Sequence, residues 1–480
     1  MPKLSGLQPQ RVLEIFEELS SIPRGSGNTK GIADFCVEYA KKLNLKYIRD
    51  NADNVIVFKD GNKCGKNAKP VILQGHLDMV CQKTEESSID FLKDGLDLYV
   101  DGDYLKARGT TLGGDNGIAV AMVFAILESN DLVHPPIEAV FTSDEEIGML
   151  GATVLDTTPL KSKLMINLDS EEDDVMTVSC AGGREVSASF VINTENKCGT
   201  KVVVDFKGLK GGHSGVEINS GRVNSNVLAS RFLNHMKKQF EFDLISIGGG
   251  DKSNAIPNRT VISLLLQNAH EFKKTADEYL TLVKSEISSR EEDFAPEVLI
   301  EDASEYQVFS KEDANRVINA ILLAPNGIIE MSREIEGLVE TSLNLGILKY
   351  ENGTIFMQYA LRSNKMSALD ALEEKLCAYF DLAAAKTEVS GHYPPWEFKD
   401  NSLLQKLYIE TYLKEIGFNV KVEAIHAGLE CGVFSSKIND LDCIAVGPTL
   451  FDVHTVNEKL SISSLHKFFS LLSKVLEKLA

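Results

Sequence analysis

The sequence has no long apolar run and no hydrophobic leader. None of its apolar stretches approaches the ~20 consecutive residues that a membrane-spanning helix needs. The first ten residues, MPKLSGLQPQ, contain no basic patch followed by an apolar segment, which is the pattern of a secretory signal. We therefore expect a cytoplasmic protein that does not contact membranes.

Positive charge is scarce relative to negative charge. The 480 residues include 50 Lys and Arg against 70 Asp and Glu, which gives a formal net charge of -20. A surface with this balance repels phosphate backbones and anionic lipids, so nucleic acid partners are not expected. Hydrophobic residues make up 43% of the chain, which is typical of a folded globular protein.

The eight cysteines are scattered along the chain. No two of them have the C-x-x-C spacing of a zinc ribbon or a redox motif. A secreted disulfide scaffold would be short and dense in cysteine, whereas this chain is long. We predict reduced thiols at all eight positions: Cys36, Cys64, Cys81, Cys180, Cys198, Cys377, Cys431 and Cys443.

Hydrophobic periodicity predicts an α/β fold in the first part of the chain. Helical spacing covers residues 12–19 and 32–40, and short apolar strands follow at 55–58 and 71–73. A strongly apolar run at 117–127 indicates a buried helix. Alternating helices and strands of this kind predict a sheet flanked by helices.

The length and a change of pattern predict two domains. A single core stops growing near ~250–300 residues, and this chain is longer. Alternating strands and two long helices replace the earlier pattern in the middle of the chain, and Pro394 and Pro395 mark the end of that region. We predict a catalytic domain formed by residues 1–182 and 396–480, with an inserted α+β domain at 183–395.

Five segments place a histidine or a carboxylate at the end of a predicted strand or just beyond it. In the first of them, alternate residues of an extended strand face the same side, so Asp78 can hold the imidazole of His76 in one tautomer. A purely structural His–Asp hydrogen bond is the alternative. In the second, Asp115 follows two glycines and precedes the buried helix, where a helix N-cap is also expected.

Glu145, Glu146, Asp169 and His454 belong to the other three segments. Adjacent glutamates project in different directions, so one can bind a metal while the other moves protons; a solvated acidic turn is the alternative. The carboxyl edge of an open α/β sheet is where such folds place their sites. A mixed set of histidine and carboxylate ligands suits zinc, manganese or cobalt.

The segments GHLDMV, GGDNGIA, SDEEIG, INLDSEE and FDVHTVNE resemble the ordered motifs of the di-zinc metallopeptidases that include glutamate carboxypeptidase and the aminoacylases. The similarity extends along the whole chain, includes HAGLECG at 426–432, and points to the aminoacyl-histidine (Xaa-His) dipeptidase branch, relatives of the carnosinases. This resemblance implies a zinc peptidase fold with an inserted lid and dimerisation domain. It also implies two divalent metal ions, a dipeptide substrate and a homodimer.

The resemblance assigns a role to each metal ligand. Asp115 would bridge the two ions, which are expected to be zinc, with cobalt or manganese as alternatives. His76 and Asp169 would complete the coordination of one ion, and Glu146 and His454 that of the other.

The resemblance also assigns the groups that move protons and orient the ligands. Glu145 would be the general base and then the general acid, and Asp78 would orient its histidine. A cis peptide bond is implied between Asp115 and Asn116. An aspartate rather than a glutamate at position 169 accompanies peptidases that need a free amino terminus, which favours a dipeptidase over a carboxypeptidase.

Four further residues are weaker candidates. The resemblance suggests that His213 stabilises the oxyanion, in some family members across a dimer, although a histidine between glycines is also typical of a loop. Asn254 and Arg362 would bind the substrate, and a turn and a surface group are the alternatives. Glu430 would contact a substrate terminus, or it would form a buried pair with His426.

Two other functions compete with a dipeptidase. A deacylase of N-acyl amino acids would use the same scaffold on a different amide. A catalytically silent peptide- or metal-binding protein would keep the fold, but such a protein has no need for the proton shuttle that Glu145 would supply.

Overall fold

The computed structural model describes residues 3–480, which form two compact units. Among the described residues, unit 1 comprises 3–179, Phe398–Ala424 and Leu429–Ala480, and unit 2 comprises Cys180–Glu397 and Ile425–Gly428. The sequence-based prediction places the boundaries after residues 182 and 395. The return of Ile425–Gly428 to unit 2 has no counterpart in the sequence pattern.

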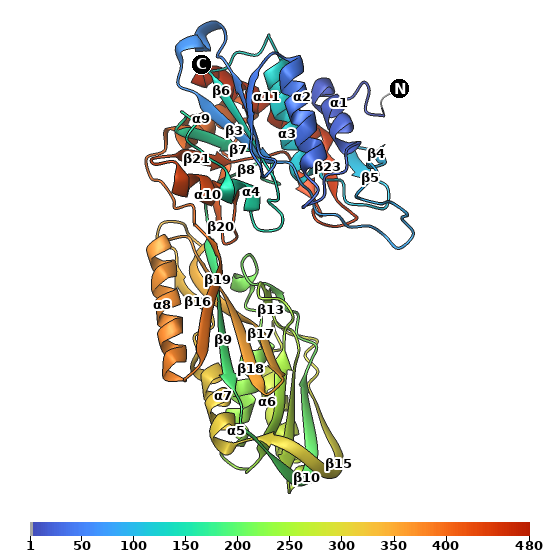
Figure 1. Cartoon of the computed structure of the whole chain (residues 1–480), viewed down its shortest axis with the longest axis vertical. Coiled ribbons are helices and arrows are strands. Elements are labelled where there is room, and N and C mark those ends of the chain that lie inside the picture. Colours follow the sequence, from blue (N-terminus) through green and yellow to red (C-terminus); the bar gives the residue numbers. More distant parts are fainter. Residues whose placement is uncertain (1–2) are drawn as a thin grey trace. The chain divides into compact units, whose positions relative to one another are not determined.

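An eight-stranded mixed sheet organises unit 1 (Figure 1). Strands β3, β6, β7 and β21 run parallel to one another, whereas the pairings of β1 with β2, β2 with β6 and β21 with β8 are antiparallel. In order across the sheet, the strands are β1 (Lys46–Arg49), β2 (Val55–Lys59), β6 (Ile137–Thr142), β3 (Val71–His76), β7 (Leu164–Asn167), β21 (Asp442–Ala445), β8 (Val175–Cys180) and β20 (Lys421–Ile425).

The register of the parallel strands brings three predicted site segments to one edge. His76 is the last residue of β3 and pairs with Thr142, the last residue of β6. Gln74 pairs with Asn167, the last residue of β7. The loops that follow β3, β6 and β7 therefore leave the sheet side by side.

Helices surround this sheet, and α3 is its most deeply buried helix. From Gly117 to Leu127 every residue of α3 is buried, in agreement with the predicted buried helix. The helix packs against α1 and β3. The helices of unit 1 are α1 (Gln10–Ser20), α2 (Lys30–Lys42), α3 (Gly114–Glu128), α4 (Leu150–Val154), α9 (Leu403–Ile416), α10 (Glu430–Lys437) and α11 (Ile462–Leu479), with a 3₁₀ turn at Lys63–Asn67.

A small four-stranded sheet completes unit 1. It joins the segment before α3 to the segment that carries His454, because β5 pairs with β23. Its strands are β4 (Leu98–Asp101), β5 (Tyr104–Ala107), β22 (Leu450–Phe451) and β23 (Lys459–Ser461). His454 lies between β22 and β23.

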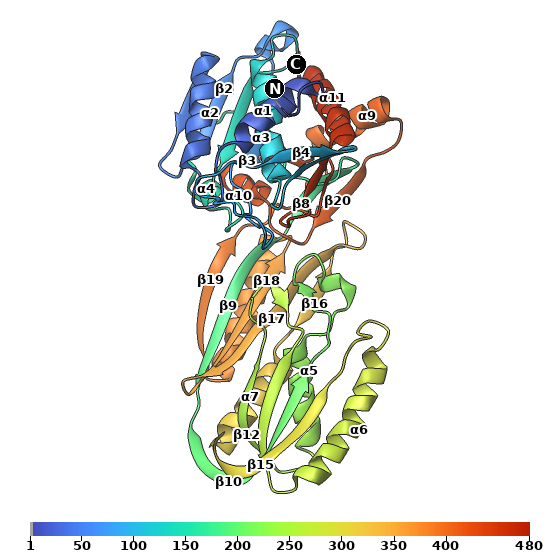
Figure 2. The ribbon, with the colours of Figure 1, turned by 90° about the vertical axis from the view of Figure 1, so that its right-hand side faces the viewer.

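Unit 2 is a nine-stranded antiparallel sheet with four helices (Figure 2). Helix α8 packs on β9, β18 and β19, whereas α5, α6 and α7 pack on the β10, β12, β14 and β15 part of the sheet. The helices are α5 (Ser225–Met236), α6 (Ala269–Ile287), α7 (Lys311–Leu323) and α8 (Met366–Leu382). The strands are β9 (Gly182–Val191), β10 (Thr194–Phe206), β12 (Asp243–Gly249), β14 (Thr260–Leu266), β15 (Glu297–Phe309), β16 (Gly327–Met331), β17 (Val339–Glu351), β18 (Thr354–Ser363) and β19 (Lys386–Tyr393).

Unit 2 has its own apolar core. Side chains from its sheet and from all four helices, including Phe232, Phe272, Ile318 and Phe380, form one buried cluster. A separate two-stranded ribbon pairs β11 (Gly212–His213) with β13 (Ala255–Ile256). Within residues 3–480, no helix is both long enough and apolar enough to cross a membrane.

Candidate metal centre

Asp115 lies between two histidines in unit 1. Its Oδ1 is 3.0 Å from Nε2 of His76, and its Oδ2 is 3.1 Å from Nε2 of His454. The peptide bond between Asp115 and Asn116 is cis, as the family resemblance implies. Each carboxylate oxygen of Asp115 therefore faces a different imidazole.

Glu146 and Asp169 extend this cluster on opposite sides. Oε1 of Glu146 is 3.0 Å from Nε2 of His454, and Oδ1 of Asp169 is 3.6 Å from Nε2 of His76. Ligand atoms of His76, Asp115 and Glu146 all lie within 4.8 Å of one another, close enough to share a metal ion. The five predicted ligands are thus brought together from three loops, one helix start and one strand end.

The cluster has an excess of negative charge. In the part of the chain that the structure describes, no lysine or arginine forms an ion pair with Asp115, Glu146 or Asp169. Burial, together with the nearby charge of Asp115, raises the pKa of Asp169 to about 6 against the opposing effect of His76. Hydrogen bonds to Asp115 and Glu146 raise the pKa of His454 to about 11. A site with this charge and these donors fits divalent cations.

Glu145 has different surroundings from its neighbour Glu146. Its carboxyl group is not part of the ligand cluster. Burial raises the pKa of Glu145 well above its usual value against the opposing charge of His76, and the charge of Asp169 adds to the increase. A half-buried carboxyl whose pKa is raised in this way suits general acid–base chemistry.

Asp78 is buried and connects the histidine to the glutamate loop. Its Oδ1 is 3.4 Å from Nδ1 of His76 and accepts a hydrogen bond from the backbone N–H of Glu145 at 3.0 Å. Its Oδ2 accepts from the N–H of Glu146 at 3.2 Å and from the hydroxyl of Ser26 at 2.8 Å. Burial alone would raise its pKa, but His76 and these hydrogen bonds lower the pKa of Asp78 to about 2.

Asp115 is not the N-cap of α3, so that alternative was wrong. Gly113 occupies the N-cap position, and Asp115 has non-helical dihedral angles. The backbone N–H groups at this helix start are taken instead by the carboxylate of Glu458, while Arg24 binds the carbonyl of Gly113. Sequence reasoning did not single out Arg24 or Glu458, because a charged residue gives no local sign of a distant backbone partner.

His213 is the last residue of the two-residue strand β11 in unit 2. Its Nδ1 accepts the backbone N–H groups of Gly215 and Val216, each at 3.2 Å, so the ring proton resides on Nε2. That Nε2 is 3.5 Å from Nη2 of Arg362. Arg362 is 7% exposed, and its Nη1 donates to the hydroxyl of Tyr393 at 2.8 Å. Two donors therefore face each other, an arrangement that suits a shared anionic acceptor.

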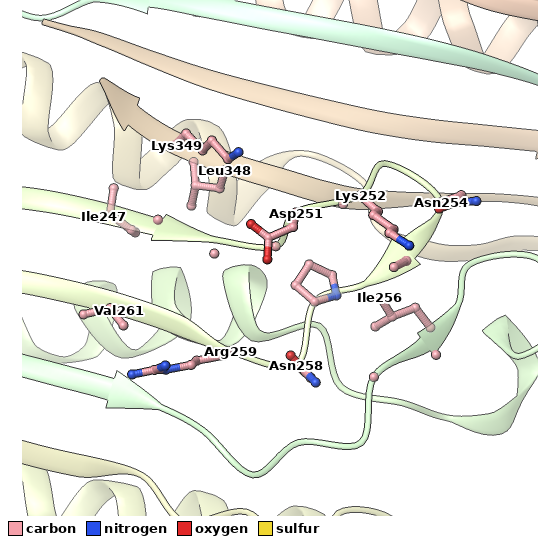
Figure 3. Close-up of a pocket in the computed structure, with 18 of the residues that line it drawn as sticks. Ile247, Asp251, Lys252, Asn254, Ile256, Asn258, Arg259, Val261, Leu348 and Lys349 are labelled. Carbon is pink, nitrogen blue, oxygen red and sulfur yellow. The ribbon is translucent and has the colours of Figure 1, made fainter. Parts of the chain in front are cut away.

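Asn254 is exposed at the edge of a cavity of about 1110 Å³ within unit 2 (Figure 3). His213 also lines this cavity. The next residue, Ser214, donates its backbone N–H to the carbonyl of Asn254 at 2.8 Å. Asp251, Lys252 and Arg259 lie around the same hollow.

Glu430 and His426 do not form the buried pair that was the alternative to substrate binding. Glu430 in unit 1 accepts hydrogen bonds from the amide of Gln74 and from the hydroxyl of Thr142. His426 in unit 2 has Nε2 2.7 Å from the hydroxyl oxygen of Ser342 and Nδ1 3.3 Å from Oδ1 of Asn364. The two side chains have separate partners because the chain passes from one unit to the other between them.

Two known proteins are similar to this chain in sequence or structure along its full length. The cytosol non-specific dipeptidase of Escherichia coli is 36% identical over 100% of this chain and 99% of that protein. The crystal structure of aminoacylhistidine dipeptidase from Vibrio alginolyticus matches with a TM-score of 0.90 and 34% identity, covering 99% of this chain and 98% of the other.

More distant structures share the fold. The aminopeptidase PepT of Bacillus cereus matches with a TM-score of 0.57 at 15% identity, over 98% of this chain and 99% of that chain. The model of peptidase family M20/M25/M40 matches residues 72–478, a span that contains all five residues of the metal cluster. The chain therefore belongs to peptidase family M20/M25/M40 and is a hydrolase that acts on peptide bonds.

Proposed function

We propose that the protein is a metal-dependent dipeptidase that holds two divalent ions, and that these ions are zinc. The position of Asp115 carries this proposal, because each of its oxygens faces a different histidine. Such a carboxylate can bridge two ions, with His76 and Asp169 on one side and Glu146 and His454 on the other. Cobalt and manganese accept similar ligands and are the alternatives to zinc.

The mechanism divides the work among the side chains of unit 1. The residues of the cluster would hold zinc ions, which would supply polarisation of a carbonyl and a lowered pKa of water, the chemistry that peptide hydrolysis needs. Glu145 accepts the proton of the attacking water and later donates it to the leaving amine. Asp78 holds the backbone of Glu145 and the ring of His76 in a fixed orientation.

Three residues of unit 2 are proposed to act on the substrate. His213 would donate its Nε2 proton to the oxyanion, since its Nδ1 already accepts backbone N–H groups. Arg362 would bind the terminal carboxylate of the dipeptide, and Asn254 would assist. Contact of Glu430 with a substrate terminus stays a prediction. The carboxylate of Glu430 is fully buried and accepts hydrogen bonds from Gln74 and Thr142.

The named relatives support dipeptides as the substrate class and the cytosol as the location. One relative is described as a cytosol non-specific dipeptidase and the other as an aminoacylhistidine dipeptidase. We infer that this protein hydrolyses dipeptides, including carnosine-like Xaa-His dipeptides, in the cytoplasm. A homodimer is part of the same proposal.

Metal analysis combined with hydrolysis tests the proposal. We expect two metal ions per chain, full loss of dipeptide hydrolysis after chelation, and its return with zinc. A single ion per chain, or hydrolysis that resists complete chelation, would contradict the proposed centre. Parallel assays with Ala- and Gly-containing dipeptides, carnosine-like dipeptides and N-acyl amino acids separate the dipeptidase from the deacylase.

A further inference from the structure

The carboxylate of Glu458 binds the backbone of the loop that ends in Asp115. Oε2 accepts the N–H groups of Leu112 at 2.8 Å and Gly113 at 3.0 Å. Oε1 accepts those of Gly114 at 2.8 Å and Asp115 at 3.3 Å. Glu458 is only 3% exposed, so water does not compete for these contacts. One side chain thus holds four consecutive N–H groups.

Arg24 binds the same loop from its carbonyl side. Its Nη2 donates to the carbonyl oxygen of Gly113, and its Nη1 donates to the carbonyl oxygens of Leu77 at 3.2 Å and Asp78 at 3.1 Å. Arg24 is 2% exposed. No carboxylate of residues 3–480 forms an ion pair with it at contact distance, so its hydrogen bonds all go to backbone carbonyls.

These contacts connect two segments that carry metal ligands. Leu77 and Asp78 directly follow His76, and Gly113 stands two residues before Asp115. Arg24 therefore ties the end of β3 to the start of α3. Charged groups bind backbone dipoles strongly when buried, and unpaired buried charges are costly, so the two side chains strongly favour one loop conformation.

We propose that Arg24 and Glu458 are positioning residues, which hold Asp115 in the orientation that places one carboxylate oxygen toward each histidine. This inference rests on the proposed metal centre. Neither residue contacts metal or substrate in this role. Their effect on metal binding is exerted through the backbone of Leu112–Asp115.

Metal titration of variants distinguishes positioning from a general contribution to stability. In Glu458→Gln the amide keeps one acceptor oxygen but turns an NH₂ group toward two backbone donors. Groups that orient metal ligands typically change metal affinity about 10- to 100-fold when altered. We expect a loss of that size when the chelated variant is titrated with Zn²⁺, and a similar loss for Arg24→Lys, because one ammonium cannot span three carbonyls.

Glu138→Gln is the matched control. Glu138 is also a buried carboxylate in unit 1, 4% exposed, and it accepts the backbone N–H groups of Lys161 and Ser162. These contacts lie at the start of β6 and before β7, whereas the ligand loops follow the other ends of those strands. The Glu138→Gln variant should lower the melting temperature of the metal-free protein without weakening zinc binding. Equal zinc affinities in the Glu458 and Glu138 variants would overturn the inference while wild-type metal binding still supported the proposed function. Absence of metal from the wild type would refute both.

Hydrogen exchange in the wild type provides a test that does not depend on folding of any variant. The N–H groups of Leu112, Gly113 and Gly114 should be protected in chelated protein, because Glu458 rather than metal holds them. The inference would be overturned if these amides exchange freely in the metal-free protein and become protected only after zinc is added. That result would show that the metal orders the loop.

Discussion

At the scale of single residues, Glu145 and Glu146 are neighbours with different tasks. Glu146 points to His454 and belongs to the ligand cluster. Glu145 is half-buried beside the cluster, and its backbone is held by Asp78 at the N–H and by the N–H groups of Gly148 and Met149 at the carbonyl. The direction of two side chains from one short loop thus separates metal binding from proton transfer.

Glu145→Gln should abolish most of the activity and leave the metals in place. General acid–base catalysis typically contributes about 10²- to 10⁴-fold, so kcat for a dipeptide should fall by that factor. Metal content, measured by atomic spectroscopy, should stay at the wild-type value. Glu146→Gln is the control, and it should lose metal. Loss of metal from the Glu145 variant would instead show that Glu145 is a metal ligand.

His426 should make unit 2 sensitive to acid. Burial, followed by the charges of Arg362 and His213, lowers the pKa of His426 to about 3. An unfolded histidine has a pKa near ~6.5, so the neutral ring is favoured in the folded state. The resulting stability is present above pH ~6.5 and is lost as the pH falls toward about 3.

Denaturant unfolding at several pH values, with chelator present, measures this effect. His426→Gln should show a flatter fall in unfolding free energy below pH ~6.5 than the wild type. The exposed His466→Gln serves as control and should follow the wild-type curve. Identical slopes for all three proteins would show that His426 does not cause the acid sensitivity.

At the scale of elements, the start of α3 depends on glycine. Gly113 has φ of +62°, and a Cβ there would lie 2.5 Å from Nη2 of Arg24 and 2.7 Å from Sδ of Met79. The same helix start carries Asp115. A side chain at position 113 would therefore disturb both the backbone conformation and the contact with Arg24.

Gly113→Ala should reduce both stability and zinc affinity. A left-handed conformation at a residue other than glycine costs of order 1–3 kcal/mol, to which the steric clash adds. Gly102→Ala is a close control, because Gly102 has φ of +61° and no atom within 4 Å of the added Cβ. Thermal unfolding and zinc titration should show a larger loss for position 113, and equal losses would exclude the clash with Arg24.

At the scale of the whole molecule, the two units carry different parts of the proposed machinery. All five proposed ligands and Glu145 belong to unit 1, whereas His213 and Arg362 belong to unit 2. Each unit has its own sheet, and unit 2 has a separate apolar core. Activity is therefore expected to depend on groups from both units.

His213→Ala should lower kcat by about 10²- to 10³-fold, the usual effect of losing one oxyanion donor, while two metals remain bound. If His213 acts across a dimer, mixtures of inactive Glu145→Ala and His213→Ala chains should regain activity, because some hybrids contain one complete site. Near-normal kcat in the single variant would contradict the role of His213. An inactive mixture, with subunit exchange verified, would exclude only the action across a dimer.

The sequence by itself determined the elements and the order of the site segments. Apolar periodicity located α1, α2 and the buried helix α3 within a few residues, because burial of one face requires that spacing. Parallel strands end at one edge, so His76, the Glu145 loop and Asp169 could be expected to meet.

Only the tertiary structure decided which distant groups meet around those segments. Glu458 binds Leu112 from 346 residues away, and Arg24 binds Gly113 from 89 residues away. Neither contact has a local sign, because a buried charge is compensated by whichever backbone dipoles the folded chain places beside it. The same reason explains why Glu430 and His426, four residues apart, have different partners: their contacts depend on the packing within each residue's own unit and not on their spacing in the chain.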